Sequence, residues 1–430
     1  MNSKKDPTAT PPAIWDVVVV GGGPAGMMAA GRAAEHGARV LLLEKNDTLG
    51  KKLLLTGGGR CNLTNAEFDT RKFLEKLKDD GKFLFSTFSQ WDVSKTLEFF
   101  HTHGMETKIE DAQRVFPMSN RAQSVWDVLI EYMRAGGVTI MSNSPVRDLL
   151  VSRTPSPTIT GVLLRTNKEV LARTIIIATG GSSHPETGST GEGFTWLKKI
   201  GHVITEPTPS LVPVVIKDPW IKKLAGIALA DAQISVFQNM VKQKTDRGKI
   251  LFTHFGISGP VVLHMSKKIG ELLKTGEVIV SIDVLPSLNQ EQLDITLQNT
   301  FTEHSNKKIG NSLSTLIPAA LVPIILAQCA IQPETVCNSI TREERLRLIS
   351  HLKNIPVHAD KLLGMDKAII TSGGVSLTEI DPKTMRSRIF PNLYLVGDIL
   401  NIDRPSGGYS LQLCWTTGFV AGDAAGKNSL

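Results

Sequence analysis

The first hydrophobic runs of the chain predict a parallel β–α–β unit. Residues 15–20 form a continuous, mostly β-branched run, which is typical of a strand buried on both faces. A glycine-rich stretch follows, and then an alanine-rich segment with good helix propensity that ends at His36 and stops at Gly37. A second apolar run at residues 39–43 ends at Glu44. A strand, a helix and a strand within about 30 residues predict a βαβ unit.

The pattern becomes β-rich in the middle of the chain. Between residues 145 and 178, short β-type runs are separated by turn-rich pieces, which predicts a small antiparallel excursion followed by a return strand. Residues 203–290 are again β-rich and contain many prolines and glycines. This composition and spacing predict a barrel or sandwich.

The segment after residue 290 has a helical pattern of apolar residues. Residues 291–353 have helical spacing, and Thr341 with Glu344 has the separation of a capping box. Residues 393–396 predict one more strand, and residues 411–425 predict a closing helix. The hydrophobic pattern therefore predicts α/β segments at both ends, with β-rich and helical segments between them.

Composition narrows the class of protein. The 430 residues are 41% hydrophobic and 21% charged, which allows a large core and excludes wholesale disorder. The longest nearly uncharged apolar stretch, residues 316–327, is too short to span a bilayer, and no signal peptide is evident, so we expect a cytoplasmic protein without a membrane partner. The four cysteines show neither CxxC nor metal-ligand spacing, which argues against a disulfide scaffold and against a metal site.

The charge balance is basic but dispersed. Lys and Arg exceed Asp and Glu by 48 − 41 = 7. The basic residues stand as scattered pairs rather than as a stripe. This favours a solvated surface that attracts an anionic cofactor or substrate, and it disfavours a nucleic-acid partner.

The strongest local motif is the G-x-G-x-x-G turn between the first strand and the first helix. Gly21 allows the tight turn, Gly23 lets the backbone approach a pyrophosphate, and Gly26 lets the helix pack closely on the strand. The helix N-terminus offers N–H groups and partial positive charge to phosphates. Glu44 stands 21 positions beyond Gly23, where its carboxylate can accept both hydroxyls of an adenosine ribose and repel a 2′-phosphate.

Two late motifs favour FAD over NAD at this turn. The apolar strand at residues 393–396 is followed by Gly397-Asp398, the position at which flavoproteins of the two-dinucleotide-binding type hold the ribityl chain. Gly407-Gly408-Tyr409 precedes the last helix, whose positive end can face the pyrimidine side of a flavin. An NAD dehydrogenase needs no such second contact from the end of the chain.

The ordered set of motifs resembles the family of FAD-dependent flavoproteins that includes aminoacetone oxidase-like and bile-acid-reductase-like members. The stretches that carry this resemblance span the chain from residue 16 to about residue 425: Gly57–Asn65, Arg114–Pro117, Ala178–Gly181, Thr187–Gly191, Thr253–Pro260 and Gly397–Gly418. One departure is Asn401, where members of the family often carry an acidic residue.

The resemblance implies an α/β fold of the two-dinucleotide-binding FAD type, with a Rossmann-like parallel sheet, an inserted β-barrel-like domain and a small helical subdomain. We expect a loose tail at residues 1–13 and a FAD-binding domain built from both ends of the chain. The expected boundaries are 14–202 with 366–430 for the FAD domain, 203–290 with 354–365 for the β-rich domain, and 291–353 for the helical subdomain.

The glycine-rich loop at residues 57–65 is expected to pass along the flavin. Its glycines allow close backbone approach, and Arg60, Asn62 and Asn65 supply donors. Cys61 is either a redox thiol or a small buried residue, and the lack of a nearby resolving partner favours the second. The predicted cofactor-binding residues are Gly21, Gly23, Pro24, Ala25, Gly26, Glu44, Lys45, Lys52, Gly58, Gly59, Arg60, Cys61, Asn62, Asn65, Val146, Thr179, Gly180, Gly181, Gly397, Asp398, Gly407, Gly408, Tyr409 and Ser410.

The predicted activity is that of a FAD-dependent oxidoreductase that moves a hydride between flavin N5 and a small organic substrate. Candidate catalytic residues are His254, as a proton relay, and Arg404 and Tyr409, which flank the C-terminal flavin loop. No second G-x-G-x-x-G follows a strand in residues 200–390, so NAD(P)H would serve only as a transient reductant docked in the substrate cleft, which is expected between the FAD domain and the inserted domain.

Three interpretations stay open from the sequence, and the first, a FAD-dependent oxidoreductase, includes two reactions. A reductase of unsaturated carbonyl compounds and an amine oxidase both agree with the resemblance. An RNA-modifying or RNA-associated flavoprotein is the alternative from another class, and a FAD-stabilised protein without turnover is the third. The sequence does not indicate the substrate, the electron acceptor or the oligomeric state.

Overall fold

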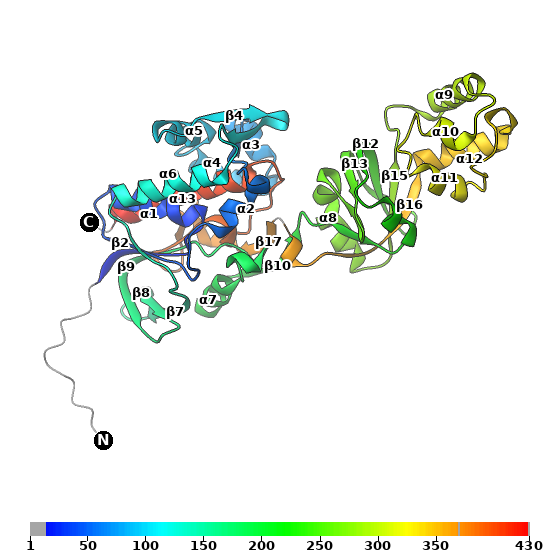
Figure 1. The fold of residues 1–430 in the computed structure, drawn as a ribbon. Helices are drawn as coiled ribbons and strands as arrows, with labels where there is room; N and C mark the ends of the chain where they lie inside the picture. Colours follow the sequence, from blue (N-terminus) through cyan, green and yellow to red (C-terminus); the bar gives the residue numbers. More distant parts are fainter. Residues whose placement is uncertain (1–13, 369, 429–430) are drawn as a thin grey trace, which may run out of the picture. The chain divides into compact units, whose positions relative to one another are not determined.

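The computed structural model describes residues 14–368 and 370–428, so the tail predicted at residues 1–13 lies outside the described residues. The chain forms two compact units, unit 1 from residues 1–208 and 370–430 and unit 2 from residues 209–369 (Figure 1). These divisions lie several residues beyond those expected from the sequence, because the chain leaves and re-enters unit 1 through two paired strands, β10 (Ile204–Ser210) and β17 (Ile370–Val375).

The core of unit 1 is a largely parallel sheet. Its central strands β1 (Trp15–Val20), β2 (Val40–Leu43), β9 (Glu169–Ile177) and β20 (Leu393–Leu395) pair in parallel in the order β20-β9-β1-β2. Val20 lies opposite both Leu43 and Ile177, so the carboxyl ends of these strands meet at one edge. This confirms the predicted Rossmann-like parallel sheet, which β6 (Thr139–Met141) extends beyond β2.

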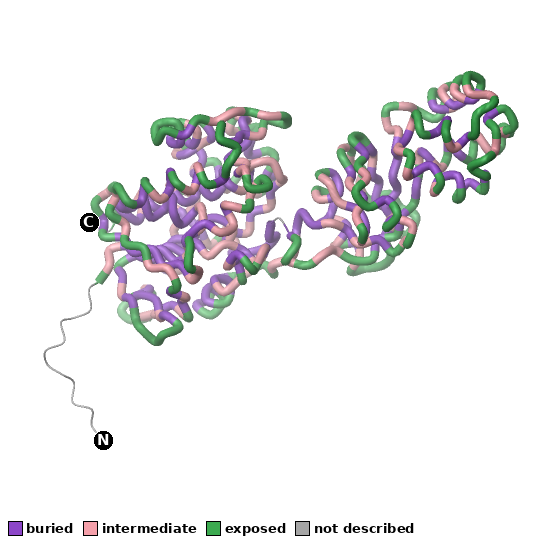
Figure 2. Tube along the Cα trace, viewed as in Figure 1, coloured by how far each residue is buried: buried purple, intermediate pink, exposed green. Residues whose placement is uncertain are grey.

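Two helices from opposite ends of the chain pack together beside this sheet. α1 (Pro24–Glu35) and α13 (Tyr409–Lys427) lie along each other, with α6 (Ala122–Ala135) next to α1 (Figure 1). Glycines permit the close approach: a Cβ on Gly418 would lie 2.5 Å from the Ala25 carbonyl oxygen, and one on Gly422 would lie 2.4 Å from that of Ala29. The two ends of the polypeptide therefore share one buried core (Figure 2).

Smaller elements surround this core. The antiparallel excursion predicted before β9 consists of β7 (Val146–Ser152) and β8 (Thr158–Leu164). A small sheet has the order β3-β5-β4. Other elements of unit 1 include α2 (Lys51–Gly59), β3 (Thr64–Asn65), α3 (Thr70–Glu75), α4 (Asp79–Phe88), α5 (Val93–Thr102), β4 (Thr107–Glu110), β5 (Arg114–Pro117), α7 (Glu192–Ile200), β18 (Ile380–Asp381), β19 (Arg386–Ser387) and the 3₁₀ turn η7 (Gly397–Ile399).

Unit 2 contains a closed antiparallel barrel, as the β-rich pattern predicted. Its strands follow the order β11-β14-β13-β12-β15-β16. Their bounds are β11 (Val214–Ile216), β12 (Ala228–Gln238), β13 (Val241–Phe252), β14 (Gly256–Ser258), β15 (Val278–Asp283) and β16 (Ile355–Leu362).

One helix that the sequence did not predict lies within the β-rich segment of residues 203–290. α8 (Pro260–Leu273) begins with a proline in its first turn and buries Val261, Met265 and Ile269 at helical spacing. The helices of residues 291–353 are α9 (Gln290–Glu303), α10 (Ile309–Leu313), α11 (Val322–Gln328) and α12 (Arg342–Lys353). The capping box of Thr341 and Glu344 is present, and the helices share one hydrophobic core with the barrel.

Candidate functional site

The glycine turn between β1 and α1 has the geometry of an anion site. Gly21 has a φ of +106°, and a Cβ on Gly26 would lie 1.9 Å from the Gly21 carbonyl oxygen, so strand and helix need glycine at both positions. A Cβ on Gly23 would instead meet no described atom within 4 Å. No side chain of the described residues caps the N-terminus of α1. The turn thus combines open space with a helix N-terminus that attracts phosphate.

Glu44 connects the second strand to this turn. The residue is 7% exposed; its Oε2 accepts the Gly22 N–H at 2.8 Å, and its Oε1 accepts the Asn46 N–H at 2.8 Å. These bonds fix the carboxylate at the carboxyl end of β2, and each oxygen retains a further lone pair for a hydroxyl donor. The predicted contact with a ribose stays a prediction, and the geometry is compatible with it.

A second glycine turn follows the carboxyl end of β9. Gly180 and Gly181 follow β9, and Gly180 has a φ of +72°. The Thr179 hydroxyl is buried without a hydrogen-bond partner among the residues that the structure describes. Lys45, also predicted at the cofactor, donates instead to Thr190 Oγ1 at 2.7 Å and pairs with Glu192 at 2.8 Å. Val146 is buried at the start of β7. The roles of these side chains toward a cofactor stay predictions.

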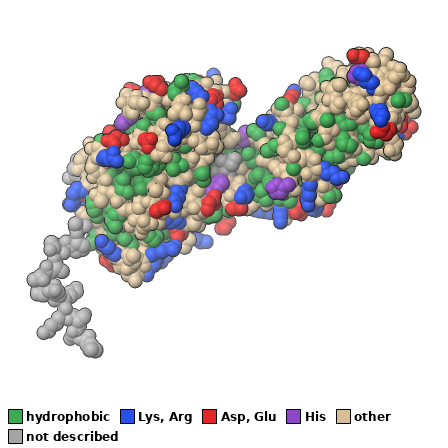
Figure 3. Space-filling view, viewed as in Figure 1, with side chains coloured by type: hydrophobic (Ala, Val, Ile, Leu, Met, Phe, Trp, Pro, Cys, Tyr) green, Lys and Arg blue, Asp and Glu red, His purple; other side chains and the backbone are tan. Residues whose placement is uncertain are grey.

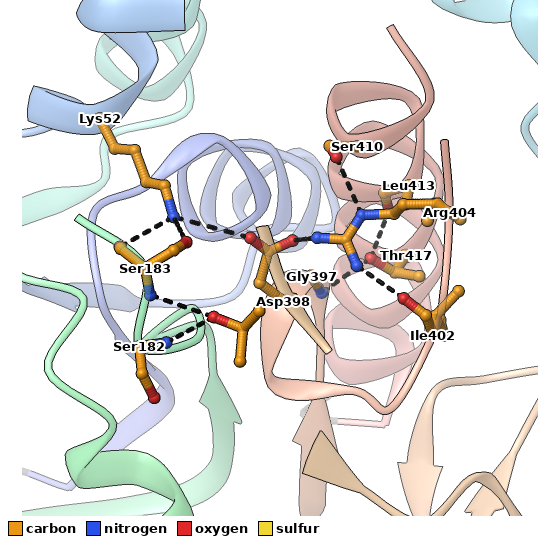
Figure 4. Close-up of polar contacts among 11 residues, drawn as sticks. Lys52, Ser182, Ser183, Gly397, Asp398, Ile402, Arg404, Ser410, Leu413 and Thr417 are labelled. Atoms are coloured by element: carbon orange, nitrogen blue, oxygen red, sulfur yellow. Dashed lines mark hydrogen bonds and ion pairs between the residues drawn. The ribbon is translucent and has the colours of Figure 1, made fainter. Parts of the chain in front are cut away.

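A polar network crosses the carboxyl edge of the sheet (Figure 4). Lys52 Nζ donates to Ser183 Oγ at 2.6 Å and to the Ser183 carbonyl at 3.1 Å, and it lies 3.9 Å from Asp398 Oδ2. Asp398 Oδ1 in turn accepts from Arg404. Burial lowers the pKa of Lys52, the nearby Asp398 carboxylate opposes this, and the positive charge of Arg404 adds to the lowering.

Arg404 holds Asp398 in place. Its side chain is 1% exposed, and it donates from Nε to Ser410 Oγ at 2.9 Å, from Nη1 to the Ile402 carbonyl at 2.7 Å and from Nη2 to Asp398. Each guanidinium nitrogen therefore has a protein acceptor. These contacts give Arg404 an orienting role toward Asp398, while direct contact with substrate stays a prediction.

The three glycines at the end of α2, where the backbone is no longer helical, are open on one side. Gly57, Gly58 and Gly59 all have positive φ, and a Cβ on Gly58 or Gly59 would meet no described atom within 4 Å. Arg60 turns toward the β4–β5 hairpin, where it pairs with Glu110 and stacks 4.1 Å from the centre of the Phe116 ring. The loop thus presents bare backbone, as expected for close approach to a flat ring.

The Cys61 thiol is buried. It is 0% exposed, and burial raises its pKa to about 12. The four cysteines are all free and buried. The second of the two interpretations offered by the sequence therefore agrees with the structure.

The N-terminal loop and the start of α13 meet directly. Asn62, with its amide oriented to satisfy its neighbours, accepts the Gly408 N–H at 3.0 Å, and Asn65 donates to the Gly407 carbonyl at 3.2 Å. A Cβ on Gly408 would lie 2.2 Å from the Thr64 carbonyl carbon. Tyr409 begins α13, and its ring lies 4.6 Å from that of Phe73. The structure therefore brings together the early and late segments that the sequence assigned to one cofactor.

His254 belongs to the other unit. It is exposed in the turn between β13 and β14, with its ring 4.9 Å from that of Phe255. Its role as a proton relay stays a prediction. The sequence also missed two contributors in unit 1, Ser183 and Thr371, whose contacts depend on distant segments and leave no local pattern.

The residues at this edge of the sheet fit a dinucleotide. Gly23 offers open space at a helix N-terminus, and Glu44 supplies a fixed carboxylate. Asp398 follows β20, and Lys52 of α2 lies 3.9 Å from it. Across residues 14–368 and 370–428, no three His, Cys, Asp or Glu side chains gather in a way that could hold a metal ion. In the same part of the chain, no helix is both long and apolar enough to cross a membrane.

Comparison with known proteins decides the family. Residues 15–424 match the HI0933-like protein Rossmann domain. The chain belongs to this HI0933-like family. It is 31% identical to a 3-dehydro-bile acid delta(4,6)-reductase of Clostridium scindens, over 95% of this chain and 98% of the relative. It is 29% identical to a ribosomal RNA dihydrouridine synthase of Escherichia coli, over 94% of this chain and 96% of the relative.

Solved structures share the fold of this HI0933-like protein at low sequence identity. A 3-ketosteroid delta1-dehydrogenase from Sterolibacterium denitrificans has a TM-score of 0.55 at 13% identity, over 96% of this chain and 100% of that one. A flavocytochrome c3 fumarate reductase has a TM-score of 0.55 at 16% identity, over 98% of this chain and 79% of that one. The predicted family resemblance and fold class are confirmed, and the predicted class of FAD-dependent oxidoreductase agrees with these findings.

Proposed function

We propose that this protein is a FAD-dependent reductase that adds hydrogen across a carbon–carbon double bond conjugated to a carbonyl group. The observation that carries the proposal is that two relatives with different named substrates each align with more than nine-tenths of this chain. One name specifies reduction of a 3-dehydro bile acid, and the other specifies formation of dihydrouridine. Both reactions saturate a double bond beside a carbonyl, so the shared chemistry is more general than either substrate.

Bound FAD would supply the hydride from N5 to the electron-poor carbon of the double bond. The chain's own residues would bind and orient the cofactor. The α1 N-terminus with Gly23 would hold the pyrophosphate, and Glu44 the adenosine ribose. Asp398, oriented by Arg404, would hold the ribityl chain.

A proton must reach the second carbon of the double bond, and Tyr409 is the candidate donor in unit 1. A phenol carries its proton at neutral pH, and burial raises the pKa of Tyr409 further above its ordinary value. His254 is the candidate from unit 2. We propose NAD(P)H as a transient reductant because the sequence contains no second dinucleotide turn that would hold it permanently.

An anaerobic titration of the purified holoenzyme tests this function. We expect NADH or NADPH to bleach the flavin absorption band, and a steroid with a 3-oxo-4,6-diene system or a uridine-containing ribosomal RNA to restore it. Bleaching by amines alone would identify an amine oxidase instead. A reduced flavin that neither acceptor reoxidises would contradict the proposed class of substrate.

Ribosomal RNA is the second candidate substrate, because two relatives carry the name ribosomal RNA dihydrouridine synthase. Against it, Lys and Arg side chains are interspersed with Asp and Glu on the face drawn in Figure 3 and form no continuous stripe there. The two substrates separate in the same titration. Reoxidation by ribosomal RNA that weakens steeply with added salt would support the RNA substrate, whereas reoxidation by the steroid alone would support the small molecule.

A further inference from the structure

Thr371 of β17 supports the turn that follows β9, which contains the predicted cofactor residues Gly180 and Gly181. The residue is 2% exposed, and its Oγ1 accepts the Ser182 N–H at 2.8 Å and the Ser183 N–H at 3.0 Å. A Cβ on Gly181 would lie 2.4 Å from the same oxygen. A hydroxyl has two acceptor lone pairs, and the turn that follows β9 uses both of them.

The turn held by Thr371 in turn holds Lys52. Ser183 accepts from Lys52 Nζ through both its hydroxyl, at 2.6 Å, and its carbonyl, at 3.1 Å. Figure 4 shows Lys52, Ser183 and Asp398 in one line of polar contacts. Thr371 fixes the Ser183 backbone, and Ser183 holds the Lys52 ammonium. The position of this ammonium therefore depends on the Thr371 hydroxyl, although the two groups are not in direct contact.

Ser372, which follows Thr371 in β17, supports the polar network at its Asp398 end. Ser372 Oγ donates to Asp403 Oδ1 at 2.7 Å, and Asp403 directly precedes Arg404, the residue that holds Asp398. Successive side chains of a strand point to opposite faces. β17 therefore contacts the polar network at two places. Thr371 contacts the turn that holds Lys52, and Ser372 contacts Asp403, which precedes the residue that holds Asp398.

We infer that Thr371 is a positioning residue for the FAD site, which acts by keeping Ser183 in place so that Lys52 stays beside Asp398. The inference rests on the proposed function, because it takes FAD as the ligand that Lys52 faces. The Lys52 ammonium lies 3.9 Å from Asp398 Oδ2, and it would pair with an anionic ligand at the site only while it is held in that position.

The test measures the dissociation constant of FAD from the full-length protein for matched variants. Thr371→Val keeps the shape and removes the hydroxyl, which leaves two backbone N–H groups without their acceptor, so we expect FAD to bind about tenfold more weakly. Thr371→Ser keeps the hydroxyl and should restore binding to within about twofold. Thr87→Val is the control: it removes another fully buried hydroxyl, one that donates to the Pro382 carbonyl at 2.7 Å, and should leave FAD binding unchanged.

A double-mutant cycle with Lys52→Met separates positioning from a general loss of structure. If Thr371 acts through Lys52, Thr371→Val should weaken FAD binding by less than about twofold in the Lys52→Met background. An equal loss in both backgrounds, or a Thr371→Val protein that binds FAD like the unmodified chain, would overturn the inference. A protein that binds no FAD before any substitution would instead overturn the proposed function, so the two failures are distinguishable.

Discussion

At the scale of single residues, Tyr409 offers the most direct test of the proposed proton transfer. Its ring packs against Phe73, and burial raises the pKa of its phenol. Tyr409→Phe keeps the packing and removes the proton, so we expect substrate reduction to slow about a hundredfold while reduction of the flavin by NAD(P)H is unchanged. Stopped-flow absorbance measures both half-reactions. If His254→Gln slows substrate reduction and Tyr409→Phe does not, the histidine is the donor.

We expect a second residue, His202, to make the free energy of unfolding depend on pH. The His202 side chain is fully buried, with Nδ1 2.7 Å from Glu379 Oε2 and Nε2 3.0 Å from Ser387 Oγ. Burial lowers the pKa of His202 below its usual 6.5, although Glu379 opposes the shift. The unfolded chain therefore binds this proton more readily, so stability from this group is complete above about pH 6.5 and falls as the pH drops from there toward the folded pKa.

Urea unfolding measures this effect. Between pH 7.5 and pH 5.5, the free energy of unfolding should fall by less in His202→Gln than in the unmodified protein, since glutamine can still donate a hydrogen bond but does not titrate. The variant should be less stable at pH 7.5, because one of two buried contacts is imperfectly replaced. Parallel pH profiles for the two proteins would show that His202 does not carry the dependence.

At the scale of elements, the contact between β3 and the start of α13 depends on Gly408. This residue has a φ of +102°, and a Cβ there would lie 2.2 Å from the Thr64 carbonyl carbon. Gly408→Ala must therefore separate the two segments, and we expect a lower melting temperature and loss of bound flavin. Gly37→Ala is the matched control, with a φ of +83° and no described atom within 4 Å of its Cβ. It should cost only the backbone strain, about 1 kcal/mol. Equal effects of both substitutions would show that the close contact is unimportant.

The elements also show which features of the fold a sequence can predict. The strands β1 and β2 and the capping box at Thr341 were predictable, because their signals lie within a few residues of each other. The helix α8 was missed because its turn-flanked apolar run, which is short and β-branched at Val261 and Val262, resembles the strands around it. In the site, the glycine turns were predictable. The hydrogen bonds that the Ser182 and Ser183 N–H groups donate to Thr371 join residues nearly 190 positions apart and have no local signal.

At the scale of the whole molecule, the two units have separate interiors. The hydrophobic core of unit 1 contains residues from both ends of the chain, such as Val18 and Trp415. The core of unit 2 draws on the barrel and its helices, with residues such as Ile282 and Leu348. The predicted cofactor-binding residues all belong to unit 1, whereas His254, the candidate proton relay, belongs to unit 2. We therefore expect FAD to stabilise unit 1 directly, and to stabilise unit 2 only if the two units unfold cooperatively.

Calorimetry can measure that coupling. A ligand that binds only the folded form raises the melting temperature of the unit that holds it, by an amount that grows with ligand concentration. We expect two thermal transitions, of which one rises as FAD is added and one stays fixed. Substitution of a large side chain in each core assigns them: Trp415→Phe should lower the FAD-dependent transition, and Ile282→Val, which removes one buried methyl group, the other. A single transition that moves as a whole with FAD would show instead that the two interiors unfold together, so that unit 2 contributes to the free energy with which unit 1 holds its cofactor.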